Sequence, residues 1–135
     1  KFATAATLVP QPVLRPAAKR TRLGVIYYGS TSPAMQEALD VLAGQGIHLD
    51  ALRLRAFPFP DSVRQFIAEH DRVFVVEQNR DAQLRSLLVN ELEIDPAKLQ
   101  KVLHFDGTPI TARFITQAIT QHVLAAAVAP VETKV

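Results

Sequence analysis

The feature that most constrains the fold is the stretch Arg72–Arg80, in which an unbroken apolar run meets a polar cluster. The run Val73–Val76 is β-branched and aromatic, which is typical of a strand buried on both faces in a parallel sheet. The polar residues 77–80 follow at its carboxyl end, where open α/β sheets bind ligands or partners. The stretch therefore predicts a buried strand that ends in a candidate site.

The same alternation of strand, polar loop and helix repeats along the chain. Because strands alternate with helices, we expect an α/β domain in three layers, α/β/α, with a mainly parallel sheet. With the first strand central, the parallel strands take the order 2-1-3-4. The remaining strands are expected at Leu23–Tyr28, Ile47–Leu54 and Lys101–Phe105, and the helices at Pro33–Gly44, Asp61–His70, Leu84–Leu92 and from Thr111 to near Pro130.

Local residues refine these expectations. Ser32 is expected to cap the first helix, with Pro33 at its first position. Arg53 and Arg55 alternate with leucines, which favours an edge strand with one polar face. The leucines of the helix after residue 82 share one face, namely Leu84, Leu87, Leu88 and Leu92.

The chain is expected to form one domain, residues 23–129, followed by a frayed tail, residues 130–135. Prolines make residues 1–22 either a linker or an arm that adds a short edge strand near Pro12–Arg15. The chain does not begin with Met, so we expect it to be a fragment or a processed product of a longer protein.

Composition excludes several function classes. Hydrophobic residues make up 48% and charged residues 21%, which argues against disorder. The net charge is only +2 and no basic stripe is present, so nucleic acid is not an expected partner. No cysteine is available for a disulfide or a metal–thiolate cluster, and the four histidines lack metal-ligand spacing, so we expect no metal site. No apolar run reaches the ~20 residues of a membrane-spanning helix, so no membrane is expected.

Candidate site residues gather where the first and third parallel strands end. Ser30 and Thr31 lie in a loop with a single glycine, which fits a capped turn better than a phosphate cradle. Glu77 is either an acid or base, or a structural carboxylate that pairs with Arg80 or accepts amides of the next helix. Asn79 and Gln83 suit the fixing of a loop or an interface.

Other candidates lie on loops and helix ends. Phe57 and Phe59, in a connector with two prolines, either cap the core or dock against another chain. Arg113 can pair with Asp106 or with a partner's carboxylate.

The histidines and serines give no catalytic set. His70 is expected to cap a helix end and His104 to lie inside a strand. Ser30 and Ser32 lack a local base and a nucleophile elbow, which makes an autonomous hydrolase the weakest of three functions. The other two are an assembly domain and a small-molecule-binding module that uses the crevice at the strand ends.

Four motifs follow one another along the chain: Gly29–Ala34, Leu54–Pro60, Val76–Leu84 and Gly107–Phe114. In this order and spacing they resemble the C-terminal domain of the alpha subunit of 2-oxoacid:ferredoxin oxidoreductases, most closely the 2-oxoglutarate enzymes. The chain departs from the family at Ala82, where many relatives carry Gly.

The resemblance implies a transketolase C-terminal-like fold in which Val13 and Leu14 supply an antiparallel edge strand. It also implies a cytoplasmic parent complex that converts a 2-oxoacid to acyl-CoA with thiamine diphosphate, iron–sulfur clusters and coenzyme A. The implied partners are the preceding domains of the same subunit, the beta subunit and ferredoxin. The resemblance transfers no catalytic residue and no bound cofactor to this chain, so the domain is expected to be an assembly scaffold.

Overall fold

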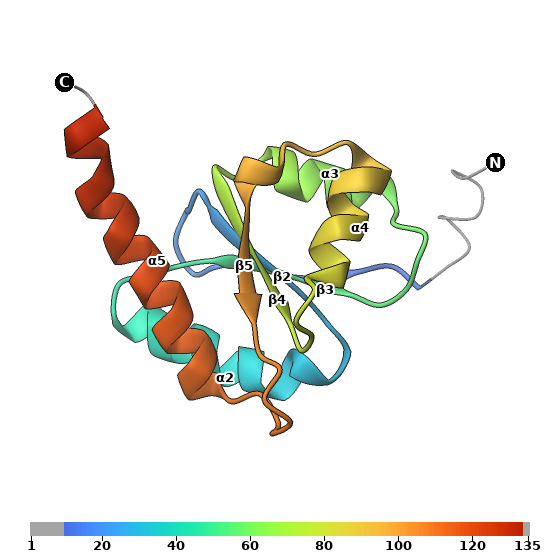
Figure 1. Ribbon diagram of the computed structural model, residues 1–135, viewed down its shortest axis with the longest axis horizontal. Helices are drawn as coiled ribbons and strands as arrows, with labels where there is room; N and C mark the ends of the chain where they lie inside the picture. Colours follow the sequence, from blue (N-terminus) through green and yellow to red (C-terminus); the bar gives the residue numbers. More distant parts are fainter. Residues whose placement is uncertain (1–9, 134–135) are drawn as a thin grey trace.

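In a computed structural model of the protein, one five-stranded sheet lies between two pairs of helices (Figure 1). The structure describes residues 10–133, but not the side chains of Ser30 and of residues 127–133. Residues 1–9, part of the expected N-terminal arm, lie outside the description. The predicted three-layer α/β/α class is confirmed.

The sheet has the order β1-β3-β2-β4-β5, in which β1 is antiparallel to β3 and the other pairs are parallel. The predicted order of the parallel strands is therefore correct, and the edge-strand alternative for the N-terminal arm is confirmed. The strands are β1 (Val13–Arg15), β2 (Leu23–Tyr28), β3 (Asp50–Leu54), β4 (Arg72–Glu77) and β5 (Leu99–Leu103).

The helices cover both faces of the sheet (Figure 1). On one face, α2 and α5 pack against a core that contains Val25, Phe74 and Ile115. On the other, α3 and α4 pack against a core that contains Ile26 and Val75. Neighbouring residues of β2 and β4 thus serve opposite cores, as expected for strands buried on both faces. The helices are α2 (Ser32–Gly44), α3 (Asp61–Ala68), α4 (Gln83–Leu92) and α5 (Ala112–Thr133), with 3-10 turns η1 (Gly29–Thr31) and η2 (Pro96–Lys98).

Two strands differ from their predicted bounds. The strand predicted at Ile47–Leu54 begins only at Asp50, and it is not at the edge, because β1 pairs with it. Arg53 of this strand is half-buried, since Val13 and Tyr27 lie beside it on the neighbouring strands. The strand predicted at Lys101–Phe105 is Leu99–Leu103, so His104 follows the strand and does not lie inside it.

Helix ends also depart from prediction. Ser32 was expected to cap α2, but it is the first residue of the helix. Thr31 occupies the N-cap position and makes no side-chain capping bond, because the 3-10 turn η1 leads directly into the helix. Helix α3 ends at Ala68, before His70. Helix α5 begins as predicted, because Thr111 Oγ1 accepts a hydrogen bond from the Phe114 amide (3.1 Å). It continues through Pro130 to Thr133 and projects beyond the sheet (Figure 1).

Helix α4 lies between two left-handed residues, Ala82 (φ 52°) and Glu93 (φ 55°). This conformation brings Cβ close to the following carbonyl and favours glycine. The position at which the motif carries Ala in place of Gly therefore has the backbone that glycine adopts most easily.

Candidate functional site

A crevice of about 510 Å³ opens at the carboxyl ends of β2, β3 and β4. The crossover from β2 passes over one face of the sheet and the crossover from β3 over the other, so the crevice lies at the switch point of the fold. Six of the predicted site residues line it: Thr31, Phe57, Phe59, Glu77, Asn79 and Gln83.

The carboxylate of Glu77 fixes the start of α4. Although Glu77 is only 5% exposed, its oxygens accept hydrogen bonds from the amides of Leu84 (2.7 Å) and Arg85 (2.9 Å) and from Asn79 Nδ2 (3.0 Å). Amides in the first turn of a helix have no intrahelical acceptor, and the positive end of the helix dipole favours a carboxylate there. The predicted structural role of Glu77 is therefore confirmed, because its carboxylate accepts hydrogen bonds from amides at the start of the next helix.

The alternative pairing of Glu77 with Arg80 is wrong. The nearest acid to Arg80 is the adjacent Asp81, with Nε and Oδ1 4.0 Å apart and both side chains exposed. An exposed pair at this distance contributes little to stability. Arg80 lies outside the crevice lining but in the loop between Asn79 and Gln83.

The loop between β4 and α4 is closed by its own side chains. Asn79 donates to Glu77, and its Oδ1 accepts the amide of Gln83 (3.2 Å). Gln78 Nε2 donates to the hydroxyl of Thr31 (3.1 Å), a buried group at the end of η1. These bonds tie the loops after β2 and β4 together and use hydrogen-bonding groups that could otherwise bind a ligand. The side chain of Ser30 lies outside the described part of the chain.

Aromatic rings form one wall of the crevice. Phe57 and Phe59 stack edge to face, with centroids 5.3 Å apart and an interplanar angle of 89°. Phe59 packs against the core on the α3 and α4 face, whereas Phe57 is 49% exposed. The two alternatives left open by the sequence are thus divided between the rings: Phe59 covers the core and Phe57 is available for contact.

Three lining residues were missed or misplaced by the sequence analysis. Tyr28, which is half exposed, ends β2 beside the expected switch point but was not named as a site residue. Gln78 was included in the polar cluster 77–80 but was not singled out as a site residue. Leu87 was assigned to the same face as the buried Leu88, but it is 42% exposed and lines the crevice. Helical spacing identifies an apolar stripe without telling which side of that stripe another element covers.

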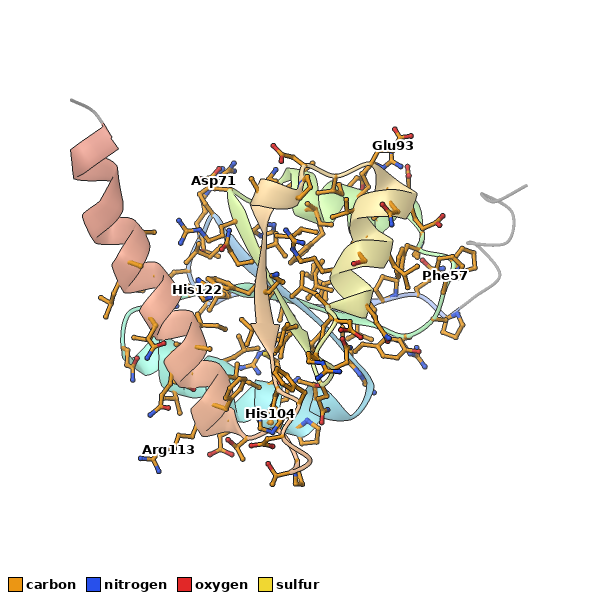
Figure 2. All side chains as sticks on the ribbon, viewed as in Figure 1. Phe57, Asp71, Glu93, His104, Arg113 and His122 are labelled. Atoms are coloured by element: carbon orange, nitrogen blue, oxygen red, sulfur yellow. The ribbon has the colours of Figure 1, made fainter. Side chains whose placement is uncertain are left out.

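Arg113 is not part of this crevice. Figure 2 shows its side chain pointing outward from the start of α5, well apart from Phe57. The predicted pair with Asp106 is absent, and no side chain in the described part of the chain pairs with Arg113. Asp106 instead accepts bonds from the hydroxyl and amide of Thr108 (2.6 and 3.0 Å) and lies 3.1 Å from His104 Nε2. The pKa of Asp106 is lowered, and the largest cause is the hydrogen bond that its carboxylate accepts from the Thr108 hydroxyl.

His70 lies at the opposite, amino edge of the sheet. It is 4% exposed, and its Nδ1 contacts the carbonyl of Phe66 in the last turn of α3 (2.6 Å), which confirms the predicted capping role. Its Nε2 contacts Asp50 Oδ2 (2.8 Å), so the ring also joins α3 to β3. Within residues 10–133, no group of three His, Cys, Asp or Glu side chains is arranged to hold a metal ion.

Comparison with solved structures identifies the fold. One match is the 2-oxoglutarate:ferredoxin oxidoreductase from Magnetococcus marinus, solved with 2-oxoglutarate, coenzyme A and succinyl-CoA bound. The TM-score is 0.76 and the identity 22%, over 87% of this chain and 20% of that chain. Another is the alpha chain of a probable 2-oxoacid ferredoxin oxidoreductase from Thermoplasma acidophilum, with TM-score 0.54 and 25% identity over 82% of this chain and 95% of that chain.

The resemblance seen in the sequence is therefore confirmed. The chain has a transketolase C-terminal-like fold, as the motifs implied, and it spans one fifth of the Magnetococcus chain. No protein-family model matches the sequence, and no curated protein matches it significantly. None of the helices in the described residues is long and apolar enough to cross a membrane.

Proposed function

We propose that this chain is the C-terminal domain of the alpha subunit of a 2-oxoacid:ferredoxin oxidoreductase, with 2-oxoglutarate as the substrate of the complex. The observation that carries the proposal is the fold match to a 2-oxoglutarate:ferredoxin oxidoreductase over 87% of the chain. The four sequence motifs support it independently, and so does the match to an alpha chain. In this proposal, residues 23–129 are the domain and the parent complex is cytoplasmic.

Within that complex the domain serves as an assembly scaffold. The only carboxylate that lines the crevice in the described residues, Glu77, already accepts three hydrogen bonds, two of them from the first turn of α4. A group so occupied is poorly placed to take a proton from a substrate, because α4 would lose its cap.

The cofactors of the parent complex do not fit the residues of this chain. Iron–sulfur clusters are held by cysteine thiolates, and the sequence contains no cysteine. The diphosphate groups of thiamine diphosphate and coenzyme A are strongly negative, and no described residue that lines the crevice carries a positive charge to bind them. In the proposal, thiamine diphosphate, the iron–sulfur clusters and coenzyme A therefore bind to other domains or to the beta subunit, and ferredoxin docks there.

Calorimetric titration tests the scaffold role. We expect no heat of binding when the purified chain is titrated with thiamine diphosphate or coenzyme A, while the assembled complex binds both. Tight binding of either cofactor to this chain would contradict a scaffold and favour a direct part in the chemistry.

A second candidate is a regulatory module that binds a small molecule in the crevice, favoured by the cavity of about 510 Å³, a volume within the usual range of ligand sites. Thermal-shift screening with 2-oxoacids and nucleotides tests it. A ligand that stabilises the chain, with an effect abolished by Thr31→Val, would support this function over the scaffold.

A further inference from the structure

Three exposed apolar side chains meet at the mouth of the crevice: Tyr28, Phe57 and Leu87, with 54%, 49% and 42% of their surface exposed. They come from β2, the connector after β3, and α4. In the rest of the described chain, large exposed apolar residues are scattered over β1, α2, α5 and the loop after β5. Apolar surface that converges from three elements on one hollow is typical of a site that another molecule covers.

The floor of the crevice offers little to a charged metabolite. Glu77, Asn79 and Thr31 already take part in internal hydrogen bonds. No described residue of the lining carries a positive charge. A 2-oxoacid carries one or two negative charges and a nucleotide carries several, and burying them without an opposite charge is costly. The lining therefore favours an uncharged apolar occupant.

The rim is polar and positively charged. Arg80 is exposed on the loop between β4 and α4, and Gln83 is exposed at the start of α4. The exposed Arg55 directly precedes the lining residue Ala56. Asp81 lies 4.0 Å from Arg80 and offsets part of this positive charge. An aromatic centre with an arginine-bearing rim has the composition of a protein–protein interface.

We propose that the crevice receives an apolar side chain from a partner subunit of the same oxidoreductase, and that carboxylates beside that side chain meet Arg55 and Arg80. This inference rests on the proposed function, which supplies the partner. It adds the face through which the domain assembles and the chemistry of the surface opposite it. The contact buries Phe57 and Leu87, while the charges at the rim set its orientation.

Hydroxyl-radical footprinting of the assembled complex, purified with the full-length subunit, tests the proposal. Phe57 and Phe105 are the matched pair, because they are 49% and 56% exposed and only Phe57 lines the crevice. We expect Phe57 to be oxidised at least about fivefold more slowly than Phe105, since the core of an interface excludes water. Equal oxidation of the two rings would overturn the proposal.

Two variants of the same complex separate the occupants. Phe57→Ser should restore oxidation of Leu87, and Arg80→Glu should do so mainly at low salt, where charge repulsion is least screened. Protection of Phe57 that disappears on dialysis would indicate a small ligand and overturn the inference. So would protection in a complex that contains only copies of this subunit. A complex that oxidises 2-oxoacids but leaves Phe57 exposed would refute the inference while the proposed function stands.

Discussion

Replacement of Glu77 by Gln tests the account of the crevice floor, because it changes one oxygen to an amide and preserves the shape. Only one oxygen then remains as an acceptor, so the amide of either Leu84 or Arg85 loses its partner and faces another donor. An unsatisfied buried amide costs about 1–3 kcal/mol. Loss of the negative charge at the start of α4 adds roughly 0.3–1 kcal/mol. We therefore expect Glu77→Gln to lower the free energy of unfolding by about 1.3–4 kcal/mol.

Urea denaturation followed by circular dichroism measures this loss. With a slope of about 2 kcal/mol per molar urea, the midpoint should fall by about 0.7–2 M. The matched control is Glu91→Gln, an exposed residue of the same helix, which should change the free energy of unfolding by less than about 0.5 kcal/mol. A loss below about 1 kcal/mol for Glu77→Gln would refute the capping account, because a buried, satisfied carboxylate cannot be replaced so cheaply.

Three further predictions concern the backbone and an exposed ion pair. Glu93→Gly should raise the free energy of unfolding by about 0.5–1 kcal/mol, because glycine adopts the left-handed conformation at the end of α4 without strain. Its control, Glu91→Gly inside the helix, should lower the free energy of unfolding by about 1 kcal/mol. If urea denaturation shows both variants changing the free energy in the same direction, this explanation is wrong. Gly24→Ala should destabilise β2, since its new Cβ would lie 2.9 Å from an aromatic ring of α3; an unchanged melting temperature would show that the ring moves freely. The carboxylate of Asp71 accepts a hydrogen bond from Arg22 (2.9 Å), which lowers the pKa of Asp71. The stabilisation by this ion pair is therefore present above about pH 3.9 and is lost as pH falls through the lowered pKa. The melting temperature of Asp71→Asn should be below that of the wild type at pH 7, and the two should converge in acid.

The sequence predicted the central strands well because their physical signal is strong. The runs that form β2 and β4 are apolar on both faces, and such runs have few alternatives to a buried parallel strand. The central position of β2 and the antiparallel β1 were also correct, although β1 was only one of two interpretations. The flanking strands shifted because their apolar and polar residues mix: the register of β5 is set by pairing with β4, which the local pattern does not contain.

The site was predicted as a location more than as a set of contacts. The carboxyl-edge rule placed Thr31, Glu77 and Asn79 together, and the structure does bring them to one crevice. Tertiary packing decides the rest. The partner of Glu77 depends on where α4 begins, and the exposure of Leu87 depends on which elements leave that helix uncovered. The pair of Arg113 with Asp106 does not form because Asp106 is satisfied within its own loop, which leaves a partner's carboxylate as the other alternative for Arg113.

The most direct test of the central claim is the activity of the full-length protein purified with its partner subunits. Reduction of ferredoxin is followed spectroscopically in the presence of 2-oxoglutarate and coenzyme A, with each omitted in turn. The account predicts reduction that requires both compounds and that produces succinyl-CoA. A purified complex that reduces no ferredoxin with 2-oxoglutarate or any other 2-oxoacid would contradict it.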